Sequence, residues 1–198
     1  MKVWIDGQEF FDMPAETDTA SVLESVKASL AKSGRVATEI RVDGVLMDED
    51  AFADLTEGLQ AHFSSQPVRT LVKDSLDEAL RYIPRLRKGL EEIAEHFEGS
   101  EFSRGQSKLA DAAEGLDWLL LVFHNCRVLL GAGEEAEGPG LEEIKTSLFE
   151  NINLLNQLFE EKKYLQMALC IRENLLGDIE KFSFYVQELH DLSSAAIQ

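Results

Sequence analysis

Cysteine, proline and histidine are scarce in this chain of 198 residues. Its two cysteines, Cys126 and Cys170, are too few and too far apart for a disulfide scaffold or a CxxC metal site. Each lies in an apolar helical pattern, which predicts a buried free thiol. The longest apolar run, Trp118 to Phe123, has six residues, whereas a membrane span needs about 20. We therefore expect no membrane partner and, because the first residues lack a signal-peptide pattern, a cytoplasmic protein.

Basic side chains are also few, with 19 Lys and Arg against 37 Asp and Glu, which gives a formal net charge of −18. The excess extends along the chain: residues 1–73 carry 7 basic and 13 acidic side chains, and residues 74–198 carry 12 and 24. Binding to phosphate backbones needs clustered Lys and Arg, so no nucleic-acid partner is expected. The charge favours a basic protein partner, and it also fits a well-solvated protein without an electrostatic role.

Motifs for catalysis and cofactor binding are missing as well. None of the four histidines has an acidic residue three positions before it, as helical di-iron sites require. The chain contains no glycine-rich phosphate loop and no Gly-x-Ser-x-Gly elbow. His124 and Cys126 are two residues apart and therefore point to different faces of a helix, which does not predict a Cys–His dyad. We expect no enzyme, no cofactor and no metal site.

The first 73 residues predict a small β-rich domain. Asp6-Gly7 and Asp43-Gly44 each lie between apolar runs, which is the pattern of a two-residue hairpin turn. Between the two hairpins, residues 19–32 place their apolar side chains on one stripe of a helix. A second helix is expected over residues 48–62, and a final strand over residues 68–73.

The order ββαββαβ resembles the ubiquitin-like β-grasp fold. The resemblance covers residues 1–73, and it implies a fold without implying conjugation to other proteins. A second resemblance lies in residues 154–176, LLNQLFEEKKYLQMALCIRENLL, which are similar to a helical hairpin of uncharacterised bacterial proteins. Those proteins have an acidic pair and a Tyr where this chain has Leu169-Cys170 and Glu173-Asn174. This resemblance implies a bacterial origin and no activity.

From Ser75 onward the apolar residues follow a helical spacing. Four amphipathic helices are expected, at residues 75–98, 104–130, 141–159 and 165–189. Pro84 predicts a kink or a break near Tyr82 in the first of them. Residues 131–140, GAGEEAEGPG, predict a linker loop. The expected fold class is α+β, with a β-grasp-like domain at residues 1–73 followed by a four-helix bundle at residues 74–198.

Four residues of the two predicted hairpins are candidates for binding a protein partner: Trp4, Phe11, Arg41 and Leu46. With two-residue turns, Val3 pairs with Phe10, and the four candidates fall on the sheet face away from the helix. Aromatic and arginine side chains are enriched at the centres of protein interfaces. The alternative is that this face packs against the chain's own helical part, because apolar sheet faces must be covered.

The helical part holds two further sets of candidates. A basic stripe, formed by Arg81, Arg85 and Lys88 at helical spacing, would suit an acidic partner or a phosphate; the alternative is pairing with acidic residues one turn away. Asn151 and Arg172 interrupt apolar seams, where a polar residue commonly fixes helix register. The alternative is a polar pocket that also includes His124.

We expect from these patterns a non-catalytic interaction protein: an adaptor, a regulator or an acidic chaperone. In size and charge the chain resembles the cytoplasmic chaperones of flagellar and secretion systems. Two alternatives stay open. One is a small-molecule-binding or enzymatic helical bundle with a polar pocket, and the other is a structural homo-oligomer, of which a homodimer is the simplest form.

Overall fold

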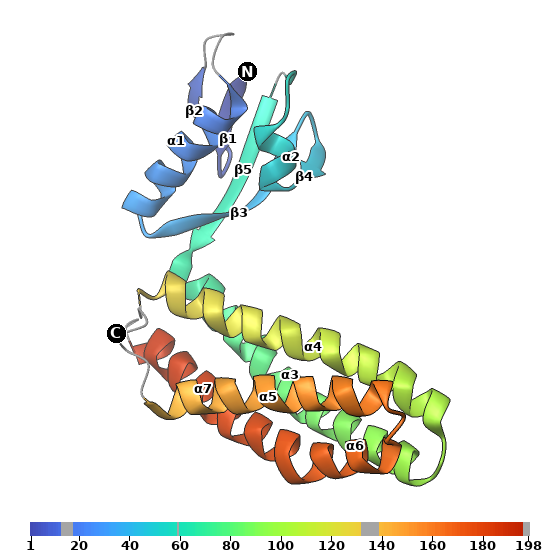
Figure 1. Cartoon of the computed structure of the whole chain (residues 1–198). Helices are drawn as coiled ribbons and strands as arrows, with labels where there is room; N and C mark the ends of the chain where they lie inside the picture. Colours follow the sequence, from blue (N-terminus) through green and yellow to red (C-terminus); the bar gives the residue numbers. More distant parts are fainter. Residues whose placement is uncertain (13–17, 59, 132–138, 196–198) are drawn as a thin grey trace. The chain divides into compact units, whose positions relative to one another are not determined.

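A computed structural model describes residues 1–12, 18–58, 60–131 and 139–195 of the chain. The chain divides into two compact units, Met1–Leu71 and Val72–Gln198. All five strands of the described residues lie in the first unit, and the second is mostly helical (Figure 1). The protein therefore has the expected α+β class, with an N-terminal sheet and a helical C-terminal region.

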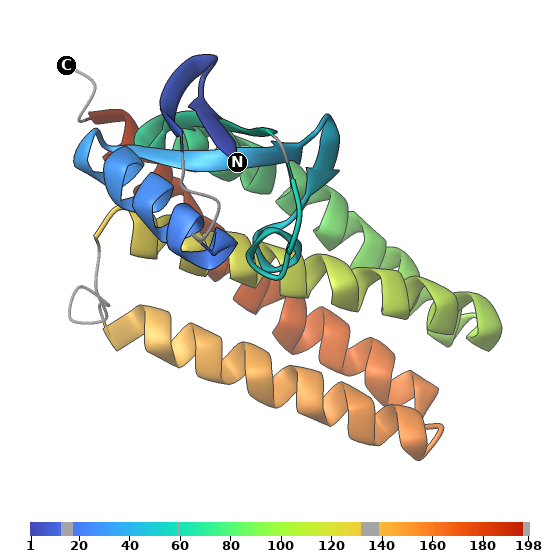
Figure 2. The same ribbon diagram turned by 90° about the horizontal axis from the view of Figure 1, so that it is seen from above.

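The first unit contains a five-stranded sheet in the order β2-β1-β5-β3-β4. Its strands are β1 (Lys2–Ile5), β2 (Gln8–Asp12), β3 (Arg35–Val42), β4 (Val45–Met47) and β5 (Gln60–Pro67). The central pair β1 and β5 is parallel, and the other neighbours are antiparallel. The helices α1 (Thr19–Lys32) and α2 (Glu49–Ala53) lie on the same side of the sheet (Figure 2).

Both hairpin turns have the predicted two-residue form. Asp6 and Gly7 have φ angles of 50° and 79°, and Asp43 and Gly44 have φ angles of 50° and 87°. Positive φ at both central positions defines a type I′ turn, which matches the twist of the flanking strands. The register of the first hairpin differs from expectation, because a bulge after Val3 pairs this residue with Phe11 instead of Phe10.

The predicted first helix is confirmed with its bounds, Thr19–Lys32. It begins after Asp18, whose side chain accepts a hydrogen bond of 2.7 Å from the backbone N–H of Ser21 and so caps the helix. Its apolar stripe packs against buried residues from β1, β3, β5 and α2 in one core. The buried members of this core are Val3, Val22, Leu23, Val26, Leu30, Ile40, Val42, Phe52, Ala61 and Phe63.

The helix expected over residues 48–62 is present but much shorter, and the strand expected over residues 68–73 is wrong. The helix α2 ends at Ala53, β5 follows at Gln60–Pro67, and residues 68–73 open the long helix α3 (Val68–Glu98). Burial alternates along β5, with Ala61 and Phe63 inside and their neighbours exposed, which is the period of a strand. The buried face of α3 begins before Ser75, where the helical pattern was expected to start. Val72 already belongs to it and is fully buried.

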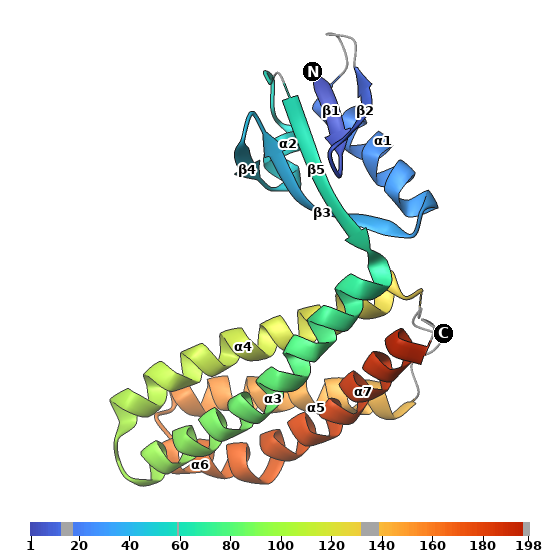
Figure 3. The same ribbon diagram turned by 180° about the vertical axis from the view of Figure 1, so that it is seen from behind.

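The second unit is built from helices that run side by side (Figure 3). They are α3, α4 (Phe102–Leu129), α5 (Pro139–Glu160), α6 (Tyr164–Cys170) and α7 (Leu176–Ala195). A π-helical turn, η2 (Ile171–Leu175), joins α6 to α7, so the single helix expected at residues 165–189 consists of three segments. The helix α3 contacts α4 through an edge-to-face pair of Tyr82 and Trp118, and α7 through an ion pair of Arg87 and Glu180.

Two local expectations about these helices are corrected. Of the kink or break predicted near Tyr82, the break does not occur, because α3 continues through Pro84. The helix α5 begins at Pro139, so the end of the predicted linker 131–140 belongs to it; proline is favoured at a helix start because its missing N–H has no partner there. Residues 132–138 of that linker lie outside the described residues. Within the described part of the chain, no helix is both long and apolar enough to cross a bilayer.

Two helical glycines differ in the space around them, and alanine substitutions should therefore change stability in opposite directions. At Gly105 a Cβ atom would lie 2.5 Å from the ring of Phe97, which is fully buried, whereas at Gly89 it would meet no atom within 4 Å. Gly89→Ala should raise the free energy of unfolding by about 1 kcal/mol through helix propensity. Gly105→Ala should lower it by about 1–2 kcal/mol, since overpacking outweighs propensity. Urea unfolding of both variants measures the two signs, and stabilisation by Gly105→Ala would contradict this packing.

Candidate functional site

Four side chains form a row across the sheet on the face opposite to α1 and α2. Trp4 of β1 pairs with His62 of β5, His62 pairs with Arg41 of β3, and Arg41 pairs with Leu46 of β4. Their sequence neighbours Val3, Val42 and Phe63 are buried in the core, so the row itself points away from it. We call Trp4, His62, Arg41 and Leu46 the outer row.

The side chains of the outer row are held in place by one another and by the strands. The rings of Trp4 and His62 stack with their centroids 4.7 Å apart and an interplanar angle of 9°. Arg41 donates a hydrogen bond to Glu39, two residues earlier on the same face, and this bond lowers the pKa of the Glu39 carboxyl. Leu46 is 58% exposed. The row therefore offers a stacked aromatic pair, a guanidinium group and an exposed aliphatic side chain in one line.

The structure brings together three of the four residues predicted to bind a partner, namely Trp4, Arg41 and Leu46. The side chain of Phe11 lies outside the described residues. His62 joins the row, and it was not predicted because residues 48–62 were expected to form a helix. The alternation of small, polar and aromatic residues in AHFS, followed by Ser-Gln-Pro, is the sequence signal of a strand that would have found it.

The predicted basic stripe lies on α3, and its cations have local contacts. Arg81 donates to the backbone carbonyl of Asp77 at 3.1 Å. The guanidinium of Arg85 lies 5.4 Å from the ring centre of Tyr82, and Lys88 is 3.8 Å from the carboxylate of Glu92 one turn later. These contacts fit the local-pairing alternative. A role of Arg81, Arg85 and Lys88 in binding stays a prediction.

A buried polar cluster lies between α5 and α7. Its centre is Asp178, which is 5% exposed. Its Oδ2 accepts a hydrogen bond of 2.7 Å from the hydroxyl of Ser147 and one of 2.8 Å from the side-chain amide of Asn151. Buried carboxylates need such donors, because burial removes the hydration of the charge. Asn151, which interrupts its apolar seam, thus donates to Asp178 of the neighbouring helix. This contact between α5 and α7 fits the register role predicted for Asn151.

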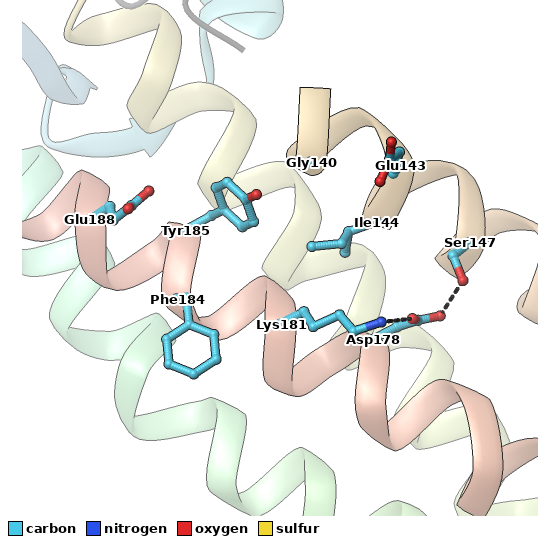
Figure 4. Close-up of a pocket in the computed structure, with 9 residues that line it drawn as sticks. All are labelled: Gly140, Glu143, Ile144, Ser147, Asp178, Lys181, Phe184, Tyr185 and Glu188. Atoms are coloured by element: carbon cyan, nitrogen blue, oxygen red, sulfur yellow. Dashed lines mark hydrogen bonds and ion pairs between the residues drawn. The ribbon is translucent and has the colours of Figure 1, made fainter. Parts of the chain in front are cut away.

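The same two helices border a groove of about 590 Å³ (Figure 4). Its walls are Gly140, Glu143, Ile144 and Ser147 of α5, and Asp178, Lys181, Phe184, Tyr185 and Glu188 of α7. Asp178 lies at one end, with Oδ1 3.9 Å from the ammonium nitrogen of Lys181. Tyr185 lies towards the other end and packs against Gly140. A Cβ atom added to Gly140 would lie 2.6 Å from the hydroxyl of Tyr185. Sequence reasoning did not find this groove.

The polar pocket considered for Asn151, Arg172 and His124 does not form. Asn151 is buried, whereas Arg172 is exposed and donates to both carboxylate oxygens of Glu98, at 2.9 and 3.1 Å. His124 is exposed on α4. Arg172 lies within the π-helical turn η2, which precedes Asp178 in the chain, and such turns are frequent near functional sites.

Both cysteines are buried free thiols. Burial raises the pKa of Cys126 to about 11, and it also raises the pKa of Cys170. A nucleophilic cysteine needs the opposite shift, because the thiolate is the reactive form. Within the described residues no group of three His, Cys, Asp or Glu side chains is arranged to hold a metal ion.

These features define an α+β protein with an N-terminal five-stranded sheet and a mostly helical C-terminal region. A family model described as a domain of unknown function, DUF8042, matches residues 74–184. This match covers more than half of the chain, and the protein belongs to the DUF8042 family. The matched segment includes the polar cluster and most of the groove. No curated protein and no solved structure matches the chain.

Proposed function

We propose that this protein is a non-catalytic interaction protein that binds a protein partner through the outer row of its sheet. The observation that carries the proposal is the alignment of Trp4, His62, Arg41 and Leu46 on four adjacent strands. Tryptophan and arginine are the residues most enriched at interface hot spots, where a few side chains supply most of the binding energy. A stacked and hydrogen-bonded row also loses little side-chain entropy on binding.

The fold proposed for the first unit is β-grasp-like. The strand order β2-β1-β5-β3-β4, with a parallel central pair and α1 packed on one face, supports this assignment. For the second unit we propose a four-helix bundle, counting α6, η2 and α7 as one interrupted helix. Such a bundle would supply a stable support, while the outer sheet face would supply the contact.

The charge of the chain points to the chemistry of the partner. With a formal net charge of −18, the protein attracts basic partners and accelerates their association at low salt. The apolar and aromatic groups of the outer row then provide the short-range contacts. A protein with an apolar patch bordered by Lys and Arg is the partner that fits both properties.

Affinity capture from cells that produce the protein tests this proposal. The tagged full-length chain should retain a stoichiometric partner at low salt, and Trp4→Ala should weaken its binding about 30-fold or more, as expected for a hot spot. Lys27→Ala is the matched control, because Lys27 lies on α1 and contacts Glu49 on the other side of the sheet. Equal capture by the wild type and Trp4→Ala would reject the outer row as the binding surface.

A further inference from the structure

The exposed side of α5 carries almost no charge over residues 146–159. Eight residues of this segment are exposed, and Glu150 is the one charged residue among them. Three of the eight are large and apolar, namely Phe149 (66% exposed), Leu154 (39%) and Phe159 (42%). On α7, by comparison, four of the seven exposed residues in the range 180–192 are charged. In a chain with a formal net charge of −18, the exposed side of α5 is therefore an unusually neutral and apolar surface.

A small apolar cavity opens beside this segment, between α5 and α4, which both lie in front of α3 in Figure 1. It has a volume of about 60 Å³, and its walls include Leu86 of α3, Leu116 of α4 and Leu155 of α5. Ala113 and Asn156 also line the cavity and are exposed, so it opens to the surface. An apolar cavity of roughly 150 Å³ holds a whole benzene molecule. The smaller cavity of this protein has room for the edge of such a ring.

The exposed ring of Phe149 lies on the same side of α5 as the cavity. Phe149 comes three residues before Ile152 and seven before Asn156, and both of these residues line the cavity. Residues at such spacings share one face of a helix, and seven residues correspond to roughly 10 Å along its axis. A protruding ring and an opening for a ring edge thus lie next to each other on one surface. Such a surface is complementary to itself, as an interface with two-fold symmetry requires.

The charge of the chain favours a second copy over a different partner at this surface. Two copies repel each other through their net charges of −18, and they approach most easily where neither presents charged side chains. A basic partner is instead attracted to the acidic surfaces elsewhere, because residues 146–159 offer it one exposed carboxylate, that of Glu150. The side-chain amides of Asn153 and Asn156 can both donate and accept hydrogen bonds. They can therefore form contacts across a symmetry axis without opposing like charges.

We propose that two copies of this chain pair through α5, with the two helices antiparallel about a two-fold axis that passes between Ile152 and Asn153. Phe149 of each copy then lies opposite Asn156 of the other copy, and the edge of its ring enters the cavity between α4 and α5. The outer row takes no part in this contact. The inference therefore goes beyond the proposed function and does not depend on it.

Sedimentation equilibrium of the full-length chain tests the pairing. The wild type should have twice the chain mass of 22.2 kDa at micromolar concentration. Phe149→Asp should weaken association about 100-fold or more, because two-fold symmetry repeats the lost contact in each copy. Phe184→Asp is the matched control: it adds the same charge at a residue of α7 that is 63% exposed, and it should associate as the wild type does. Both residues are exposed, so neither substitution should impair folding, which circular dichroism verifies.

The response to salt separates this contact from binding of a basic partner. Raising the salt concentration from about 0.05 M to about 0.5 M screens the repulsion between the copies and should strengthen their association several-fold. Trp4→Ala should leave the association unchanged, whereas it should impair partner binding at the outer row. A monomeric wild type, or equal association of Phe149→Asp and Phe184→Asp, would overturn the proposal. A photoreactive residue at position 149 that cross-links to a different protein instead of a second copy would overturn it as well.

Discussion

Raising the pH from about 9 to about 11 should lower the free energy of unfolding by about 2 kcal/mol through Cys126 alone. Burial raises the pKa of this thiol from 9.0 to about 11. Between these values the folded state keeps the proton and the unfolded state releases it. The unfolded state then binds fewer protons, so stability falls as the pH rises. Below about pH 8 this contribution is fully present, and it is lost as the pH approaches 11.

Urea unfolding at several pH values, for the wild type and for Cys126→Ala, measures this contribution. Lysine and tyrosine side chains also titrate at alkaline pH, and the difference between the two proteins removes their effect. The wild type should lose about 2 kcal/mol more than Cys126→Ala over the interval. A parallel pH dependence of both proteins would mean that the Cys126 thiol ionises as easily in the folded state as in the unfolded state.

Asp178→Ala should lower the free energy of unfolding by about 2–4 kcal/mol, because it removes the acceptor of two hydrogen bonds, one of them from the buried amide of Asn151. Ser147 and Asn151 both donate to Oδ2 of this carboxylate. Glu180→Ala, an exposed acid on the same helix, is the matched control and should cost less than about 1 kcal/mol. Thermal and urea unfolding of both variants give the comparison.

The hydrogen bond between Asn151 and Asp178 also predicts strong coupling between the two residues. Asn151→Ala and Asp178→Ala remove the same 2.8 Å bond, so the double variant should be more stable than the sum of the single effects by about 1 kcal/mol or more. Simple additivity would indicate that the two side chains do not interact in solution. It would also contradict the prediction that Asn151 fixes the register of α5 against α7.

The local features that sequence could predict are those determined by neighbouring residues. The turns at Asp6-Gly7 and Asp43-Gly44 follow from the need for positive φ, and the stripe of α1 follows from its helical period. The strand β5 was missed because its pairing with β1 and β3 joins residues far apart in the chain. Its few apolar residues gave a weak local pattern. The outer row was therefore predicted without its central member, His62.

The polar cluster depends on contacts that no local pattern contains. The sequence showed that Asn151 interrupts a seam, and it predicted a register function for this residue. Its partner Asp178 is one of 37 acidic residues, and the amino-acid sequence does not distinguish it from the exposed ones. The π-helical turn that separates α6 from α7 was also not predicted, since the apolar spacing of residues 165–189 fits a continuous helix.

The outer row can be tested most directly by photo-cross-linking in cells that produce the protein. A photoreactive amino acid at Leu46, which is 58% exposed, should cross-link one protein partner, and Trp4→Ala in the same chain should abolish the product. The same photoreactive residue at Lys27, on the far side of the first unit, should give no such product. Cross-links from Leu46 to the chain's own helical region alone, or equal products from Leu46 and Lys27, would contradict a partner-binding sheet face.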